Sequence, residues 1–228
     1  MATKAVLFDA YGTLLDVRHV AALAELRWWG HGEALSTLWR DKQVQYSWLR
    51  TLMQNYADFW QITGEALDYA VARLGLTMTA EVREELMAAY ERMRPFPDVQ
   101  PMLKTMANMG IPLAVLSNGT PTMLDRAFGA AGLRTAFAAL LSVDVVRSYK
   151  TSPQAYQIAI DAFGGVPEDF VLVSSNGWDI AGAAHFGFRT FWVNRMGAPT
   201  ERLGVKPSKI GNTLAELAPW LSADQVAP

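Results

Sequence analysis

The sequence predicts an α/β protein in which helices cover both faces of a parallel sheet and a helical block follows the first strand. Short apolar runs alternate with helix-like segments from residue 98 onward, a pattern typical of parallel sheets. Another apolar run, residues 5–8, stands alone near the N-terminus. Residues 16–96 separate it from the others and show helical periodicity with many aromatic residues.

The first strand is expected over residues 5–8, where four apolar residues indicate burial on both faces. It ends at Asp9, and Gly12 then allows a turn because glycine adopts backbone angles that other residues avoid. A carboxylate at the carboxyl end of a buried parallel strand stands where such sheets bind ligands. From this stretch alone, a functional carboxylate and a simple capping residue are equally good interpretations of Asp9.

The block 16–96 contains an aromatic-rich stripe at three-, four- and seven-residue spacings, which predicts one long helix with a single buried face. Its members are Leu35, Trp39, Tyr46, Leu49, Met53, Tyr56 and Trp60. We interpret this face as core or helix–helix contact, with a dimer surface as the alternative. A further helix is expected over 80–93, and it ends before Pro95 because proline disfavours helix in the preceding residue.

In the second half, strands are expected over 111–116, 137–143, 170–173 and 190–193. Helices are expected over 101–108, 123–131, 153–163, 179–186 and 214–221. Gly110 and Gly132 suit helix ends, while Ser152 suits an N-cap and Pro153 a first helical position.

Composition narrows the classes of function. The chain has 228 residues, 51% of them hydrophobic and 18% charged, so it can bury a large core. A net charge of −2 without basic runs argues against nucleic acid or an anionic membrane as the main partner. The lack of cysteine excludes disulfides, thiolate metal sites and a catalytic thiol. Without a signal peptide or an apolar stretch of ~20 residues, a soluble cytoplasmic protein is expected.

Polar groups follow the carboxyl ends of four predicted strands. They are Asp9, the pair Ser117-Asn118, Lys150 and the segment 174–179. A lone serine there is usually a helix cap and a lone lysine is usually solvated. Their joint occurrence at the ligand-binding edge of one sheet is stronger evidence for a site, because helix caps require no lysine.

The chemistry that these groups permit is nucleophilic. A carboxylate becomes a good nucleophile when fixed donors replace water around it and a lysine keeps it ionised. Ser117, Asn118 and backbone N–H groups are placed to orient a second carboxylate, that of the substrate. The covalent product on Asp9 would be an ester, which water must then cleave.

Four sequence motifs resemble those of the haloacid dehalogenase superfamily, and together they cover nearly the whole chain. They are Phe8-Asp9-Ala10-Tyr11-Gly12-Thr13-Leu14, Ser117-Asn118-Gly119, Lys150 and Ser174-Ser175-Asn176-Gly177-Trp178-Asp179. The resemblance implies a Rossmann-like three-layer core, residues 1–15 and 97–228, with a helical cap domain, residues 16–96. It also implies that Asp9 is the nucleophile.

Two departures from the motifs of the superfamily's phosphatases indicate which branch of the superfamily this chain resembles. Phosphatases of this superfamily carry a second aspartate two residues after the nucleophile, where this chain has Tyr11. They also hold magnesium with paired acidic residues, whereas Asp179 is the only carboxylate within 174–179. Both departures resemble the (S)-2-haloacid dehalogenases, which implies that no metal or other cofactor is needed. Residues 38–50 resemble the first cap helix of that branch, while Thr151 replaces the proline that commonly follows the lysine.

The resemblance implies hydrolytic dehalogenation of short (S)-2-haloalkanoic acids to (R)-2-hydroxyalkanoic acids, with inversion, through an ester on Asp9. The catalytic residues that it implies are Asp9, Thr13, Arg40, Ser117, Lys150, Tyr156, Ser174, Asn176 and Asp179. The implied substrate- and halide-binding residues are Ala10, Tyr11, Arg40, Val44, Phe59, Ser117, Asn118 and Trp178. The expected partners are a small 2-haloacid, water, halide and a second copy bound through the cap helices.

Two alternatives have other consequences. A phosphatase of the same fold would need magnesium and phosphate esters, and Tyr11 argues against it. A non-catalytic member would bind a small acid or a partner protein, and the presence of Asp9, Lys150 and Asp179 together argues against that. The sequence does not determine halogen preference or substrate chain length.

Overall fold

A computed structural model describes residues 3–226, and a six-stranded parallel sheet forms its centre. The strand order is β3-β2-β1-β4-β5-β6. The strands are β1 (Ala5–Phe8), β2 (Leu113–Ser117), β3 (Ala139–Ser142), β4 (Phe170–Ser174), β5 (Arg189–Val193) and β6 (Lys209–Gly211). The first five confirm the predicted strands. The sixth was not predicted, because three residues that are mostly exposed carry no apolar run.

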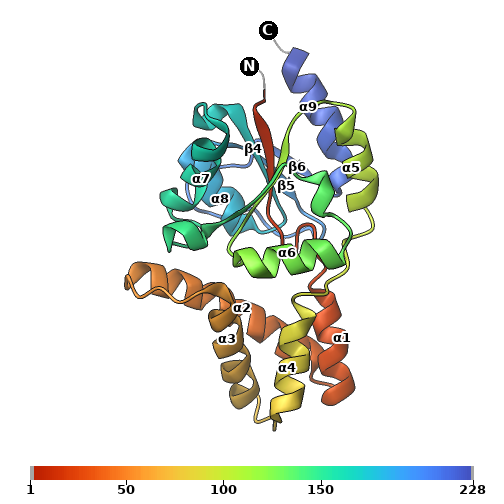
Figure 1. The fold of residues 1–228 in the computed structure, drawn as a ribbon, viewed down its shortest axis with the longest axis vertical. Helices are drawn as coiled ribbons and strands as arrows, with labels where there is room; N and C mark the ends of the chain where they lie inside the picture. The colour runs from red at the N-terminus through yellow and green to blue at the C-terminus, as the bar shows by residue number, and fades with distance from the viewer. Residues whose placement is uncertain (1–2, 227–228) are drawn as a thin grey trace.

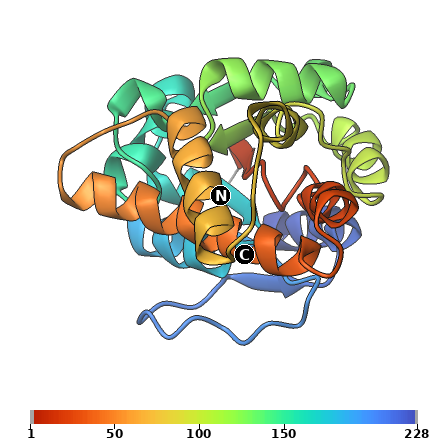
Figure 2. The same ribbon diagram turned by 90° about the horizontal axis from the view of Figure 1, so that it is seen from below.

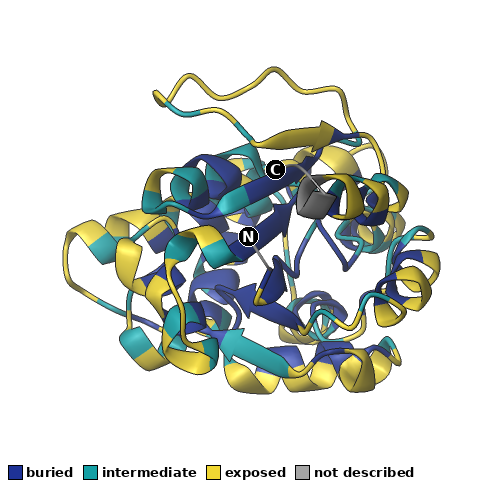
Figure 3. Ribbon diagram, turned by 90° about the horizontal axis from the view of Figure 1, so that it is seen from above, coloured by how far each residue is buried: buried dark blue, intermediate teal, exposed yellow. Residues whose placement is uncertain are grey.

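The central strands are buried along their whole length, as Figure 3 shows in dark blue. Five helices belong to the part of the chain that makes the sheet: α5 (Val99–Ala107), α6 (Pro121–Ala130), α7 (Pro153–Phe163), α8 (Gly177–Phe186) and α9 (Leu217–Val226). They flank the sheet and complete the three-layer α/β core that the sequence predicts. Each lies within a few residues of its predicted range, although α9 is preceded by a short 3₁₀ turn at Leu214–Glu216.

One predicted cap is wrong in detail. Pro153 occupies the first position of α7, as expected, but the side chain of Ser152 makes no capping bond to the helix. The Ser152 hydroxyl instead accepts from Ser148 Oγ at 2.8 Å and donates to Gln154 Oε1 at 2.6 Å. Side-chain partners therefore occupy the oxygen that would cap a backbone N–H.

The first four of the helices between β1 and β2 pack together, and we call them the cap helices. They are α1 (Arg18–Arg27), α2 (Gly32–Leu52), α3 (Phe59–Arg73) and α4 (Ala80–Ala89). They lie together at the end of the sheet toward which β1 runs (Figure 1), and Figure 2 shows them in front of the sheet when it is viewed along its strands. The two connections to the sheet run side by side, since Asp16 N–H donates to Arg94 O at 2.8 Å and Phe96 N–H to Leu14 O at 3.0 Å.

The prediction of one long aromatic helix was wrong beyond residue 52. Gln54 has a left-handed φ of 54°, which ends α2, and the Asp58 carboxylate starts α3 by accepting the Gln61 N–H at 2.8 Å. Tyr56 and Trp60 therefore lie outside α2. The buried face also differs, consisting of Gly32, Leu35, Trp39, Gln43, Val44 and Ser47.

The second expected helix of this block is shorter than predicted. It ends at Ala89, while Tyr90 and Met93 remain buried in the connection that follows. Within residues 3–226, no helix combines the length and the apolar character that crossing a membrane requires.

Candidate active site

The Asp9 carboxylate is fixed by three donors from three parts of the chain. Its Oδ2 accepts from Thr13 Oγ1 at 2.9 Å and from Asn176 Nδ2 at 2.8 Å. Its Oδ1 lies 3.2 Å from Lys150 Nζ. Asp9 follows the central strand β1 directly and is 6% exposed. Fixed donors therefore replace most of the water around this carboxylate.

Thr13 is oriented by the loop after β4. Its hydroxyl oxygen accepts the Ser175 N–H at 2.9 Å, so the hydroxyl proton is free to point at Asp9. The turn between Asp9 and Thr13 requires a glycine, since Gly12 has a φ of 89°. The motif thus brings Thr13 back onto the carboxylate that precedes it by four residues.

Lys150 lies between two carboxylates in the interior. Its Nζ is 2.7 Å from Asp179 Oδ2 and 3.2 Å from Asp9 Oδ1, and its side chain is fully buried. Burial alone lowers the pKa of Lys150, but the charges of Asp179 and Asp9 outweigh it and raise the pKa above its usual value. Lys150 is therefore an ammonium ion at neutral pH. Its backbone N–H donates to Asn118 Oδ1 at 3.0 Å, while Thr151 is exposed.

Asp179 faces Lys150 from the first turn of α8 and is fully buried. The Tyr156 hydroxyl donates to Asp179 Oδ1 at 2.9 Å. Burial raises the pKa of Asp179, and the nearby Lys150 only partly offsets that increase. Burial also raises the pKa of the Tyr156 phenol well above its usual value, so Tyr156 stays protonated and acts as a donor.

Two serines support the loops that follow neighbouring strands. Ser117 Oγ accepts the Gly119 N–H at 3.1 Å, and Ser174 Oγ accepts the Asn176 N–H at 3.1 Å. Both serines are fully buried at the carboxyl ends of β2 and β4. The predicted polar groups from four strand ends therefore meet at one edge of the sheet.

The cap helices contribute Arg40 through a buried polar chain. Arg40 Nη1 donates to Gln43 Oε1 at 2.7 Å, and Gln43 Nε2 donates to Thr63 Oγ1 at 2.7 Å. Burial raises the pKa of the phenols of Tyr11 and Tyr90, and the positive charge of Arg40 partly offsets that increase at both. Gln43 was missed by sequence reasoning, because a glutamine on an amphipathic helix is normally assigned to the solvent face.

The aromatic residues implied by the resemblance occupy two places. Phe59 lies between the rings of Tyr11 and Tyr149, at centroid distances of 6.3 and 5.9 Å. Trp178 is half-buried and packs edge-on against Trp48 of α2 at 5.6 Å, joining α8 to the cap helices. Val44 is buried on the same face of α2 as Gln43, and Ala10 is buried beside the nucleophile.

Tyr149 and Arg195, which the sequence analysis did not single out, connect the segments at the carboxyl edge of the sheet. The Tyr149 hydroxyl donates to Ala57 O at 2.6 Å, and its N–H donates to Thr51 Oγ1 at 3.1 Å, which ties the segment carrying Lys150 to the end of α2. Arg195 donates to Ser175 Oγ at 2.7 Å, Asp98 Oδ1 at 2.9 Å and Thr13 O at 3.2 Å. No local pattern marks either residue, because each acts through partners distant in the sequence.

In a protein without cysteine, a metal ion would be held mainly by histidine, aspartate and glutamate side chains. Across residues 3–223, no three histidine, aspartate or glutamate side chains are grouped so that they could hold one. Asp9 and Asp179 approach each other, but the ammonium of Lys150 lies between them.

Known proteins share this architecture. The model of haloacid dehalogenase-like hydrolases matches residues 3–187. The (S)-2-haloacid dehalogenase of Pseudomonas sp. (strain YL) is 43% identical over 204 residues, covering 90% of this chain and 88% of the relative. A crystal structure of an L-2-haloacid dehalogenase has a TM-score of 0.95 and 46% identity over 97% of this chain and 100% of the other.

A second solved structure is informative about chemistry. It is the L-2-haloacid dehalogenase from Xanthobacter autotrophicus with chloropropionic acid covalently bound, with a TM-score of 0.91 and 37% identity over 100% of both chains. These relatives match nearly the whole chain, so the family assignment applies to the whole fold and not to one segment of it. The chain belongs to the haloacid dehalogenase-like hydrolases, in the branch of the (S)-2-haloacid dehalogenases.

Proposed function

We propose that this protein hydrolyses short (S)-2-haloalkanoic acids to (R)-2-hydroxyalkanoic acids, with Asp9 as the nucleophile. The observation that carries the proposal is the Asp9 carboxylate, held by Thr13, Asn176 and Lys150 at the end of the central strand. A relative of 37% identity that holds chloropropionic acid covalently supports a covalent intermediate.

In the first step, Asp9 attacks C2 of the substrate from the side opposite the halogen. The new C–O bond forms as the C–halogen bond breaks, and the bonding electron pair leaves with the halide, which inverts C2. Oδ1 is the proposed attacking atom, because Oδ2 already accepts two hydrogen bonds. Lys150 keeps the carboxylate ionised and close to the substrate.

The substrate needs two further recognition sites. Ser117 and the backbone N–H groups of Ala10 and Tyr11 are proposed to hold its carboxylate. The proposed surroundings of the alkyl group and the departing halide come from both parts of the molecule: Arg40, Val44, Phe59, Asn118 and Trp178. Arg40 stabilises the halide as its negative charge develops.

In the second step, water attacks the carbonyl carbon of the Asp9 ester. Asp179 is the proposed base, and Lys150, Tyr156, Ser174 and Asn176 maintain its surroundings. Thr13 and Asn176 donate to Oδ2, where negative charge accumulates as water adds. Expulsion of the hydroxy acid restores the Asp9 carboxylate.

The proposed mechanism needs residues from two parts of the molecule, the helical block after β1 and the part that contains the sheet. We propose that residues 16–96 form a cap domain over a core domain of residues 1–15 and 97–228. Arg40 and Phe59 come from the former, while Asp9 and Lys150 come from the latter. The relative placement of these two parts then sets the distance between nucleophile and halide site.

The direct test is halide release from the separate enantiomers of 2-chloropropanoate in buffer containing EDTA. Chloride should appear from the (S) enantiomer only, at a rate that the chelator does not change, with (R)-lactate as the product. No chloride from either enantiomer would contradict the proposal. Phosphate esters with magnesium would then be assayed next.

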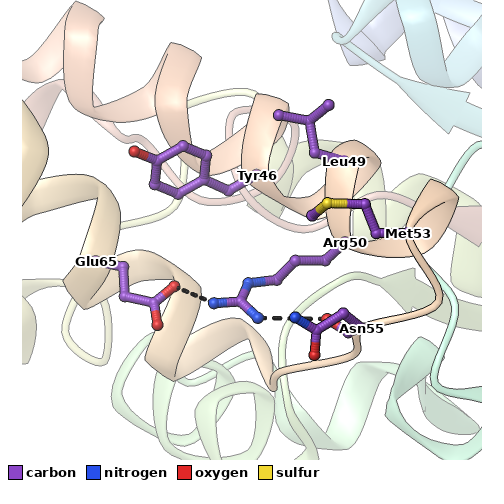
Figure 4. A pocket seen from close by; sticks show the side chains of 6 residues that line it. All are labelled: Tyr46, Leu49, Arg50, Met53, Asn55 and Glu65. Atoms are coloured by element: carbon purple, nitrogen blue, oxygen red, sulfur yellow. Dashed lines mark hydrogen bonds and ion pairs between the residues drawn. The ribbon is translucent and has the colours of Figure 1, made fainter.

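A second copy of the chain is the proposed partner of α2. Its outer face exposes Leu49, Leu52 and Met53 at 42, 79 and 62%. Two of these residues border a hollow of about 410 Å³, in which Arg50 is held by Glu65 at 2.7 Å and by Asn55 O at 3.3 Å (Figure 4). Apolar side chains around a fixed ion pair suit burial against another protein surface.

Sedimentation velocity tests this homodimer. The wild type should sediment as a dimer, and Leu52→Glu should shift it toward monomer. Val166→Glu, which changes an exposed residue far from α2 in sequence, should leave the dimer intact. A monomeric wild type would contradict the proposal. The cytoplasmic location expected from the sequence stays a prediction.

A further inference from the structure

We propose that the phenol hydroxyl of Tyr11 donates a hydrogen bond to the halide as it departs, beside the guanidinium of Arg40. This inference rests on the proposed dehalogenase function and assigns one specific donor to the halide site. The catalytic account above does not use this hydroxyl.

The Tyr11 hydroxyl has no hydrogen-bond partner among the side chains and backbone groups that the structure describes. Tyr11 is 2% exposed, and its hydroxyl is the one buried side-chain oxygen or nitrogen within residues 3–223 that makes no hydrogen bond. Burying a hydroxyl without a partner destabilises a folded protein, so nearly all such groups are paired. An unpaired hydroxyl beside the nucleophile indicates that its acceptor arrives with the substrate.

The ring of Tyr11 is held on several sides. It packs against Phe59 at 6.3 Å and against Tyr90 at 5.8 Å. It also lies over Gly119, where an added Cβ would stand 3.0 Å from Tyr11 Cε2. The glycine that ends the Ser117-Asn118-Gly119 motif therefore makes room for the ring. A hydroxyl on so confined a ring keeps its direction without the substrate, which is what stabilisation of a developing charge requires.

The charges around the phenol match the proposed role. Besides burial, the charges that act on the pKa of Tyr11 are the carboxylates of Glu91 and Asp9, which raise it, and the guanidinium of Arg40, which lowers it. Burial raises the pKa of Tyr11 well above its usual value, and Tyr11 keeps its proton throughout. Arg40 then supplies charge and Tyr11 supplies a directional hydrogen bond.

The chemistry of the leaving group explains a phenol at this position. In the phosphatases of the superfamily, the residue two places after the nucleophile is an aspartate that acts as an acid/base group. A halide leaves with the electron pair of the C–halogen bond and needs no proton, because it is a very weak base. A donor that does not ionise is therefore sufficient, and the proton remains on the Tyr11 oxygen.

Tyr11→Phe tests the inference, because it removes one oxygen and leaves the ring. Single-turnover halide release from (S)-2-chloropropanoate should slow by about tenfold to a hundredfold, the range expected for one hydrogen bond to an anion. Release from (S)-2-bromopropanoate should slow less, since bromide accepts hydrogen bonds more weakly. KM should change less than kcat, and added chloride should inhibit the variant more weakly.

Thermal unfolding of two Tyr→Phe variants distinguishes a hydroxyl that has no partner in the free protein from one that has a partner. Tyr11→Phe should leave the Tm unchanged or raise it, because the lost hydroxyl had no partner in the free protein. Tyr149→Phe should lower the Tm, since the buried hydroxyl of Tyr149 donates to Ala57 O at 2.6 Å. A purely structural role for the Tyr11 hydroxyl predicts a lowered Tm instead.

The outcomes separate this inference from the proposed function. If the wild type releases chloride and Tyr11→Phe releases both halides at the wild-type rates, the inference is overturned while the proposed function stands. An equal slowing for chloride and bromide, together with a lowered Tm, also overturns it. If the wild type itself releases no halide, the proposed function fails and the inference fails with it.

Discussion

Lys150 and Asp179 form an ion pair that solvent does not reach: Nζ lies 2.7 Å from Oδ2, and both side chains are fully buried. The same ammonium lies 3.2 Å from Asp9, so one cation serves two carboxylates. Their surroundings differ, because Asp9 is 6% exposed while the fully buried Asp179 accepts a hydrogen bond from Tyr156. This difference supports the proposed roles of Asp9 as the nucleophile and Asp179 as the base.

Asp9→Asn and Asp9→Ala should abolish halide release without unfolding the protein, because neither side chain can form the ester. Halide assays and thermal unfolding check this pair. Substantial residual turnover in either variant would refute the nucleophile assignment. In a single turnover of the wild type in water labelled with oxygen-18, the label should enter Asp9 and not the product, as mass spectrometry of the peptide would show.

Lys150→Met should abolish turnover and lower the free energy of unfolding by about 3–5 kcal/mol, since it leaves buried carboxylates without their cation. The pKa of Lys150 is raised in the folded protein, so its stabilising contribution is complete below the ordinary lysine value of 10.5. It is lost only as pH rises through the higher folded pKa.

Urea denaturation of the wild type and Lys150→Met at several pH values measures this contribution. The difference should not decrease between neutral pH and about 10, because Lys150 keeps its charge in the folded protein over that range. A difference that already vanishes between pH 8 and 9 would mean that burial lowers the pKa instead. Lys104→Met, at an exposed position of α5, is the control and should change stability by less than about 0.5 kcal/mol.

Asp179→Asn should form the ester but not hydrolyse it, giving a burst of about one halide per site and then little turnover. In the wild type, burial raises the pKa of Asp179 above its usual 3.8, and the base must be ionised to act. Ester hydrolysis should therefore decline on the acid side at a pH above 3.8. The folded protein also binds this proton more tightly than the unfolded chain, so Asp179 makes folding less favourable as pH rises through that range. Full turnover in the variant would reject Asp179 as the base.

Tyr149→Phe should lower stability by about 1–3 kcal/mol, because the buried carbonyl of Ala57 loses its donor. It should also reduce kcat/KM, since that contact seats the cap helices with Arg40 against the segment that carries Lys150. Tyr69→Phe on the exposed side of α3 is the matched control. Equal kinetics for the two variants would show that the contact has no part in aligning the site.

Arg195→Met should reduce kcat through Thr13 and Ser175, which orient Asp9, and should remove the cation that pairs with the partly buried Asp98. A loss of about 1–3 kcal/mol in stability is expected. Arg134→Met breaks an exposed pair with Asp125 at 3.7 Å and should change stability by less than about 0.5 kcal/mol. If Arg195→Met lowers stability but not kcat, Arg195 does not position the nucleophile.

The features that could be predicted are those that leave a local pattern of apolar residues in the sequence. The β1 run and the later strands were visible because a buried parallel strand needs a continuous apolar run. Since the carboxyl ends of parallel strands share an edge, the sequence alone places Asp9, Lys150 and Asp179 together. The end of α2 was not predictable in this way, because the left-handed Gln54 interrupts a periodicity that continues in the sequence.

The sequence by itself determined the α/β architecture, the inserted helices and the polar groups that meet at the sheet edge. Only the tertiary structure decided which groups touch: Arg195 reaches Thr13 across 182 residues, and Lys150 reaches Asp9 across 141. It also decided that the Tyr11 hydroxyl is buried without a partner. The physical reason is that periodicity reports the environment of one segment, whereas hydrogen-bond partners depend on how distant segments pack.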